Sequence, residues 1–324
     1  MDVASSSSRR GWKVVRVTRK ANPIGWISDD ETRERFLYLR KGKFVVPHKF
    51  LDLHFFMDEG FLFQKWIASQ GLTKFVQMKG ECYPGLVEVF YANLKVVNGV
   101  IQSRVKGVNI TINDYVWSTI VELKAEGLHS HVHDSKSNIW LKNKTIYRDC
   151  LRYPGRYKMD KLYLHNCLNK EEKMVTYVLS WLLLPGRALR DRITTEDVFL
   201  LNAIKTRIPT NWIEVFKNHM IDVGINHGFN LPYGVFISRV LILQGVDIFE
   251  EDRLLCNKSQ KIGKASLTHI GLKKTADGWF FRDEQIVVTF LTGHLFLMKI
   301  LFSFLKQSLK NLLWKPLGQL LKDF

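Results

Sequence analysis

Three histidines at alternating positions are the residues of this sequence best suited to hold a metal ion. His129, His131 and His133 lie in the run GLHSHVHD. In an extended segment every second side chain points to the same side, and imidazole is a good zinc ligand. Cys150 could be a fourth ligand, but structural zinc sites usually show closely spaced Cys or His pairs, which are absent here. The run is therefore interpreted as an exposed polar loop, with a weak zinc site as the alternative, and no cofactor is predicted.

Carboxylates are the second group that could do chemistry, because strand-transfer nucleases gather three of them around two metal ions. In this sequence they occur in short clusters: 29–31, 58–59, 171–172, 196–197 and 250–252. Most of these lie at expected helix starts or in loops, where capping explains them. No phosphate-binding loop, zinc knuckle or Asp-Thr/Ser-Gly protease signature occurs. No catalytic residue is predicted, and a metal-dependent transposase or nuclease is the least favoured function.

The third group is a basic stretch near the N-terminus, RRGWKVVRVTRK. Its cations and its tryptophan are the candidate nucleic-acid-binding residues: Arg9, Arg10, Trp12, Lys13, Arg16, Arg19 and Lys20. Lysine and arginine neutralise phosphates, and a tryptophan can stack on a base. Such binding would be weak, non-specific and strongly salt-dependent. The alternative is a solvated tail or part of a nuclear-import signal.

The charge of the whole chain agrees with a polyanionic partner. Formal net charge is +17 over 324 residues. Residues 1–28 carry six basic residues against one acidic residue, and residues 257–324 carry eleven against four. Basic ends suit nucleic acid or an anionic membrane face. The four cysteines are dispersed and the chain starts without an apolar stretch, so we expect free thiols and a nuclear or cytoplasmic location.

An apolar stretch near the C-terminus complicates that expectation. Residues 286–305 contain fourteen apolar residues out of twenty, close to the length of a membrane span. Lys299 and His294 count against spanning. Cations at 299, 306 and 310 share one helical face, as in an amphipathic helix. Packing on the protein, a single-pass span and interfacial attachment through residues 286–310 all stay open.

Periodicity and capping residues predict a mainly α fold: a helical domain with one small antiparallel β-hairpin at about 100–112, which could divide into two helical subdomains. The side chains expected in its core are Phe90, Leu94, Trp117, Trp181 and Trp212. The expected organisation is a basic, disordered tail (1–28), a helix–hairpin–helix subdomain (29–125), an irregular connection (126–170), a helical subdomain (171–256), a basic linker (257–285) and an apolar, amphipathic C-terminal helix (286–324).

The stretch 83–123 carries a more specific signal. Its motif residues are Tyr83, Pro84, Phe90, Tyr91, Asn93, Leu94, Arg104 and Gly107. Weaker matches follow at Leu184–Pro185, 195–201, 230–234 and 245–247. This pattern resembles the plant transposon protein domain, with Lys106 at a position where that family usually has arginine. The resemblance covers roughly residues 30–250 and implies a protein derived from a plant retroelement, without catalytic residues that could be transferred.

The function expected from these observations is that of a non-enzymatic, transposable-element-derived protein. It would be a structural module that associates with nucleic acid or with itself. A membrane-attached protein of unrelated role is the alternative.

Overall fold

The computed structural model describes residues 14–15, 30–132, 138, 142–156, 163–186, 192–225 and 229–284. The candidate residues Arg9 to Lys13, Arg16 to Lys20 and His133 lie outside these ranges, and so does the apolar stretch 286–305. The chain divides into two compact units, Met1–Ala265 and Ser266–Phe324. Within the described ranges, no helix has the length and apolarity that a membrane crossing requires.

The prediction of a mainly α fold with a single hairpin is wrong. The described residues are about 52% helical and 17% strand, and their strands form four small sheets of two or three strands each. Most of these strands are only two to four residues long. Such short strands show no alternation of apolar and polar residues, so the sequence pattern could not reveal them.

Capping residues mark the start of some helices of the first unit. Asn113 accepts a hydrogen bond from the Val116 amide at 3.1 Å, as expected for the cap of α6, and Thr194 forms a reciprocal capping box with Asp197 at α9. The α-helices are α1 (Asp30–Gly42), α2 (Leu53–Asp58), α3 (Phe63–Ser69), α4 (Thr73–Val76), α5 (Pro84–Ala92), α6 (Asp114–Val121), α7 (Asn143–Asp149), α8 (Lys170–Val178), α9 (Thr195–Thr206), α10 (Trp212–Ile225) and α11 (Gly234–Leu243). Short 3-10 turns occur at Pro154–Arg156, His165–Cys167 and Lys258–Gln260, and α8 continues into a π-helical turn at Leu179–Leu183.

The expected hairpin is present, and a third strand extends it into a small sheet. Strands β5 (Val100–Val105) and β6 (Val108–Ile112) pair antiparallel, and β4 (Lys95–Val97) adds a third strand beside β5. Lys106 and Gly107 form the turn, with φ of 50° and 82°. Positive φ at both central residues is what a tight two-residue hairpin turn requires. The side-chain amide of Gln244 bonds to both the N–H and the carbonyl of Thr111, which covers the outer edge of β6.

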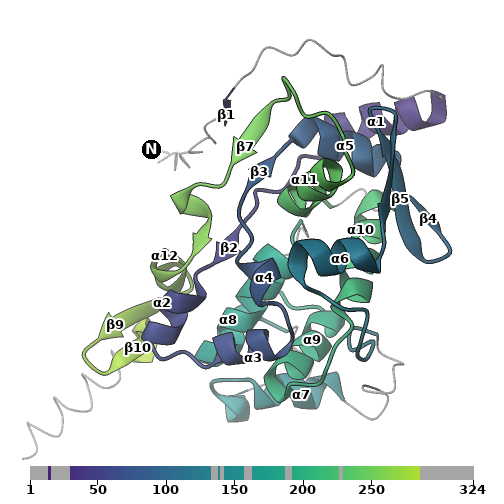
Figure 1. The fold of residues 1–324 in the computed structure, drawn as a ribbon. Helices are drawn as coiled ribbons and strands as arrows, with labels where there is room; N and C mark the ends of the chain where they lie inside the picture. Colours follow the sequence, from purple (N-terminus) through teal and green to yellow (C-terminus); the bar gives the residue numbers. More distant parts are fainter. Residues whose placement is uncertain are drawn as a thin grey trace, which may run out of the picture. The chain divides into compact units, whose positions relative to one another are not determined.

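Two further sheets in the first unit join segments that are far apart in sequence. One has the order β1 (Val14–Val15), β7 (Arg253–Leu255), β3 (Glu81–Cys82), all antiparallel. In the other, β2 (Phe50–Leu51) pairs in parallel with β8 (Lys261–Ile262). Figure 1 shows β2, β3 and β7 next to one another beside the helices. This arrangement brings residues 50–54, 77–82 and 253–261 together.

The second unit is described as far as Glu284. Helix α12 (Lys264–His269) leads into a hairpin of β9 (Leu272–Thr275) and β10 (Gly278–Phe281). The Arg282 guanidinium donates to the Thr268 carbonyl at 3.2 Å, and the Arg282 amide donates to the Gly271 carbonyl at 3.0 Å. These bonds fasten the end of the hairpin to the end of the helix.

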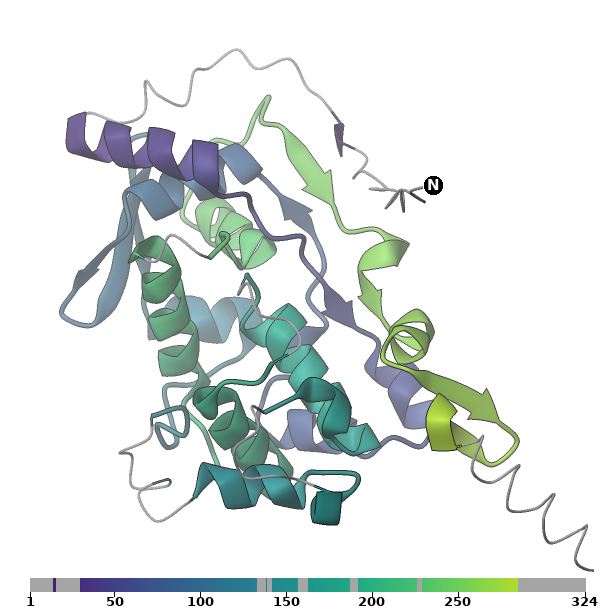
Figure 2. The ribbon, with the colours of Figure 1, turned by 180° about the vertical axis from the view of Figure 1, so that it is seen from behind.

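Cations from α1 and the residues after it stabilise the C-terminal end of α10, which is seen from behind in Figure 2. The Arg35 guanidinium donates to the Gly224 carbonyl at 3.5 Å, and the Lys43 ammonium donates to the Val223 carbonyl at 2.5 Å. Positive charge is favourable at this end of a helix because the last carbonyls have no partner within the helix. Burial, with Arg35 nearby, lowers the pKa of Lys43.

Stacked aromatic rings form the centre of the core in the first unit. Phe75 of α4 stacks on Phe216 of α10 at a centroid distance of 4.3 Å, and Trp117 of α6 stacks on Phe236 of α11 at 4.4 Å. Trp117 and Phe216 also lie 5.9 Å apart, so the two pairs form one cluster. Such ring pairs contribute about 0.5–1.5 kcal/mol each beyond their burial.

Four of the five expected core residues are confirmed: Phe90, Leu94, Trp117 and Trp212 are buried. The prediction for Trp181 is wrong, because its side chain is only half-buried. Trp181 lies in the π-helical turn, whose wider spacing shifts side chains away from the phase of an α-helix. The Lys49 ammonium lies 4.9 Å from the centre of its ring.

Phe90→Ala tests the packing of α5. The Phe90 side chain is 0% exposed and its ring meets Tyr91 edge-on at 5.5 Å. Removing a buried phenylalanine ring should lower the free energy of unfolding by about 3–5 kcal/mol. Tyr115→Ala on the exposed surface of α6 is the control and should change it by less than about 0.5 kcal/mol. Urea denaturation measures both, and a loss below about 1 kcal/mol for Phe90→Ala would mean that α5 does not form the core.

Candidate nucleic-acid interface

The histidine run does not form a metal site in the residues that the structure describes. The rings of His129 and His131 are 6.3 Å apart, and His131 Nε2 lies 2.9 Å from the side-chain amide nitrogen of Asn218. Burial, and then the neighbouring His129, lower the pKa of His131. Nowhere in the described ranges do three His, Cys, Asp or Glu side chains gather closely enough to hold a metal ion.

Cys150, the fourth candidate ligand, lies in a different setting. Its thiol is buried at the end of α7 and lies 3.9 Å from the Lys205 ammonium. Burial raises the pKa of this thiol to about 11. It is therefore protonated at neutral pH and poorly suited to bind a metal.

The carboxylates of the predicted clusters take part in structural contacts. Glu171 accepts hydrogen bonds from the amides of Leu62 and Phe63 at the start of α3. Glu172 pairs with the Lys205 ammonium at 2.6 Å in a largely buried setting. Glu171 thus caps α3, whereas the contact of Glu172 is an ion pair rather than a helix cap.

The motif residues before the hairpin hold α5 and the three-stranded sheet together. Pro84 is at the first turn of α5, and Phe90, Tyr91 and Leu94 are buried. The side-chain amide of Asn93 donates to the Arg104 carbonyl of β5 at 3.0 Å. We call residues 83–107 the first motif block and the weaker matches between 184 and 247 the second. The Tyr91 hydroxyl donates to the Pro232 carbonyl at 3.2 Å and thereby joins the first block to the second.

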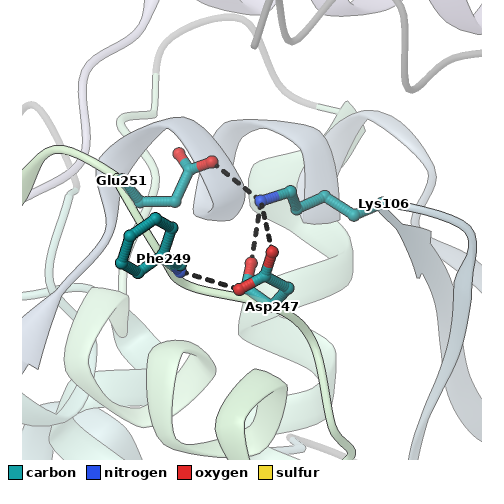
Figure 3. Close-up of polar contacts among 4 residues, drawn as sticks. All are labelled: Lys106, Asp247, Phe249 and Glu251. Atoms are coloured by element: carbon teal, nitrogen blue, oxygen red, sulfur yellow. Dashed lines mark hydrogen bonds and ion pairs between the residues drawn. The ribbon is translucent and has the colours of Figure 1, made fainter. Parts of the chain in front are cut away.

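Lys106 makes a second connection between the two motif blocks (Figure 3). Its ammonium donates to the Asp247 carbonyl at 2.8 Å and to the Glu251 carboxylate at 3.1 Å. The Asp247 carboxylate in turn accepts from the Phe249 amide at 2.9 Å. The Glu251 side chain is only 6% exposed, and Lys106 provides a cation directly beside this nearly buried carboxylate. The family usually has arginine at position 106. Lys106 preserves the positive charge there and uses it in a structural contact.

A cleft of about 520 Å³ lies where β2 and β8 meet β3 and β7. Three lysines line it, Lys79, Lys258 and Lys261, each on an exposed part of the chain. Its apolar lining includes Phe50 of β2 and Leu255 of β7. None of these lysines was among the predicted binding residues. Lys79 is far from Lys258 and Lys261 in the sequence, so no local cluster of basic residues marks the cleft.

The cleft carries an excess of positive charge. Its two carboxylates are each paired: Asp52 with the Lys261 ammonium, and Glu81 with the Arg253 guanidinium at 2.7 Å. Burial by itself raises the pKa of Asp52, but the hydrogen bonds from Lys261 and from the Phe55 backbone amide, together with the positive charge of Lys261, outweigh it, so the pKa is lowered. In the described part of the chain no carboxylate pairs with Lys79 or Lys258, and the Lys79 ammonium lies 4.5 Å from the centre of the Phe50 ring.

A neighbouring histidine adds no charge at neutral pH. His48 Nε2 lies 2.8 Å from the Met78 carbonyl, directly before Lys79. Burial lowers the pKa of His48 to about 4. The positive charge at the cleft therefore comes from its lysines and from Arg239. The Arg239 guanidinium donates to the Lys79 carbonyl at 2.6 Å.

Strand β1 lies within the predicted basic stretch of the sequence and pairs with a strand that borders this cleft. Val14 pairs with Leu254 and Val15 with Arg253, while the next residue of β7, Leu255, lines the cleft. Lys13 and Arg16 directly flank β1 in the sequence. The backbone pairing thus places Val14 and Val15 at the strand that borders the lysine-lined cleft.

A family profile described as "Putative plant retrotransposon-related domain" matches residues 68–247, more than half of the chain. The chain belongs to this family. The resemblance inferred from the motif residues is therefore confirmed. No curated protein and no solved structure matches the chain. Within the plant retrotransposon-related domain, Lys79 lies on the cleft, whereas Lys258 and Lys261 follow the matched residues.

Lys106→Ala tests the connection between the motif blocks of this retrotransposon-related domain. The variant leaves the largely buried Glu251 carboxylate without its cation, which should cost about 1–3 kcal/mol of unfolding free energy. Lys106→Arg keeps the charge and should recover most of that stability. Lys95→Ala, on exposed β4, is the matched control. Equal stability of Lys106→Ala and Lys95→Ala in urea denaturation would contradict a stabilising role for this contact.

Proposed function

We propose that this retrotransposon-derived protein is a non-enzymatic module that associates with nucleic acid, chiefly through residues 9–20. The observation that carries the proposal is the pairing of β1 with β7. Val14 and Val15 lie within the most basic short stretch of the sequence, and they pair with the strand whose next residue, Leu255, lines a cleft with three lysines. Two cationic regions that are distant in sequence then act on the same polyanion.

The chemistry of this region suits the phosphate backbone more than particular bases. Each cation that neutralises a phosphate releases condensed counterions, which drives binding without sequence information. Trp12 lies between Arg10 and Lys13 in the sequence, a combination of charge and aromatic surface that is typical of single-strand binding. The proposed binding is therefore tolerant of sequence and sensitive to salt.

The test is a fluorescence titration of a labelled single-stranded oligonucleotide at several salt concentrations. Changing Arg9, Arg10, Arg16 and Arg19 to alanine should weaken binding and flatten the dependence of log K on log salt. The slope should fall by about 0.7 for each phosphate of a single strand that the variant no longer neutralises. The melting temperature should stay nearly unchanged, because arginine side chains are rarely part of a hydrophobic core.

A control variant with the same reduction of charge separates local binding from net charge. Lys65, Lys124, Lys142 and Lys144 are exposed on other parts of the first unit, and changing all four to alanine also removes four positive charges. This variant should keep most of the affinity and the slope. No binding by the unchanged protein at low salt, or equal weakening in both variants, would overturn the proposal.

A further inference from the structure

The cleft between β2, β8, β3 and β7 has the size of a small-molecule site. Its volume of about 520 Å³ lies within the range of roughly 300–1,000 Å³ that is common for such sites. It is built by backbone pairing between residues about 170 to 210 positions apart, so its walls belong to paired strands rather than to one mobile loop. A single nucleotide fits this volume.

The charges of the cleft select an anionic group. Asp52 and Glu81 are already neutralised by Lys261 and Arg253, as described above. Lys79 and Lys258 then supply positive charge that no described carboxylate offsets. A phosphate between these two ammonium groups would meet attraction without displacing an existing ion pair.

The remaining lining suits a nucleobase. Leu255 is 46% exposed and offers an apolar surface, and Phe50 lies in the same cleft. Gln77 and Asn257 also line it with side-chain amides, which can donate to and accept from a base edge. A base inside a duplex is stacked and paired, so only an unstacked base could enter.

We propose that this cleft binds one nucleotide of a single-stranded nucleic acid, with its phosphate at Lys79 and Lys258 and its base against Leu255. This inference rests on the proposed function, because the strand that reaches the cleft is the one held by residues 9–20. It adds a defined site for one nucleotide of the strand, beyond the salt-dependent contact with residues 9–20.

Cys256 provides a direct reporter of occupancy. It lines the cleft, is half-buried and is a free thiol, whereas Cys167 is exposed elsewhere and Cys82 and Cys150 are buried. The alkylation rates of Cys256 and Cys167 in the full-length protein can be followed by mass spectrometry with and without a deoxythymidine oligomer. Burial raises the pKa of Cys256, so the reaction is run at mildly alkaline pH.

Occupancy of the cleft should slow alkylation of Cys256 and leave Cys167 unchanged. At an oligomer concentration of roughly ten times the dissociation constant, about nine-tenths of the protein is bound, so the Cys256 rate should fall about tenfold. Lys79→Ala with Lys258→Ala should abolish this protection while the titration still shows binding. Both lysines are exposed, and an unchanged melting temperature of the double variant confirms that it is folded.

Three further measurements test the N-terminal arginines, the base and the phosphate separately. The variant lacking the four N-terminal arginines should still protect Cys256 when enough oligomer is added to saturate it. An oligomer with abasic positions should protect much less, and inorganic phosphate alone should not protect. Full protection by either of these would overturn the placement of a base in the cleft.

The outcomes also distinguish this inference from the proposed function. Normal oligomer binding with an unchanged Cys256 rate would overturn the cleft as a nucleotide site and leave the proposed function intact. Absence of oligomer binding in the titration would overturn both.

Discussion

The close approach of Gly234 to its neighbours is the constraint on which the first unit depends. A methyl group at this position would lie 2.6 Å from Cys82 Sγ and 2.8 Å from Val45 Cγ1, closer than atoms can pack. Only glycine allows the start of α11 to lie against both β3 and the extended segment before β2. The residue before it, Tyr233, adopts φ of 57°, an uncommon conformation for a bulky side chain.

Hydrogen bonds around this point hold the unusual backbone in place. The Tyr233 hydroxyl donates to the Leu183 carbonyl at 2.6 Å, at the end of the π-helical turn. The Tyr83 amide donates to the Ser238 hydroxyl at 3.0 Å and thereby joins β3 to α11. Because β3 pairs with β7, the same contacts fix one wall of the lysine-lined cleft. The core of the retrotransposon-related domain and the proposed binding region therefore share one structural support.

The features that depend on neighbouring residues, namely helix starts and the hairpin, could be predicted from the sequence. Asn113 and Thr194 have side chains typical of helix caps and lie directly before α6 and α9, and Gly107 readily supplies positive φ in the turn of the predicted hairpin. The cleft could not be predicted in this way. Its strands are two or three residues long, and Phe50 and Lys261 are brought together only by tertiary pairing. Trp181 was misplaced because nothing local in the sequence marks a π-helical turn.

The distribution of charge partners separates structural lysines from those suited to binding. Lys106 and Lys205 each pair with a carboxylate that is less than one-tenth exposed, and removing such a cation leaves a costly buried charge. Around the cleft, by contrast, Lys261 and Asp52 form a partly exposed pair, which contributes little to stability. Lys79 and Lys258 have no carboxylate partner among the described residues. A polyanion can therefore bind at the cleft without breaking an ion pair on which the fold relies, whereas binding at Lys106 or Lys205 would require one to break.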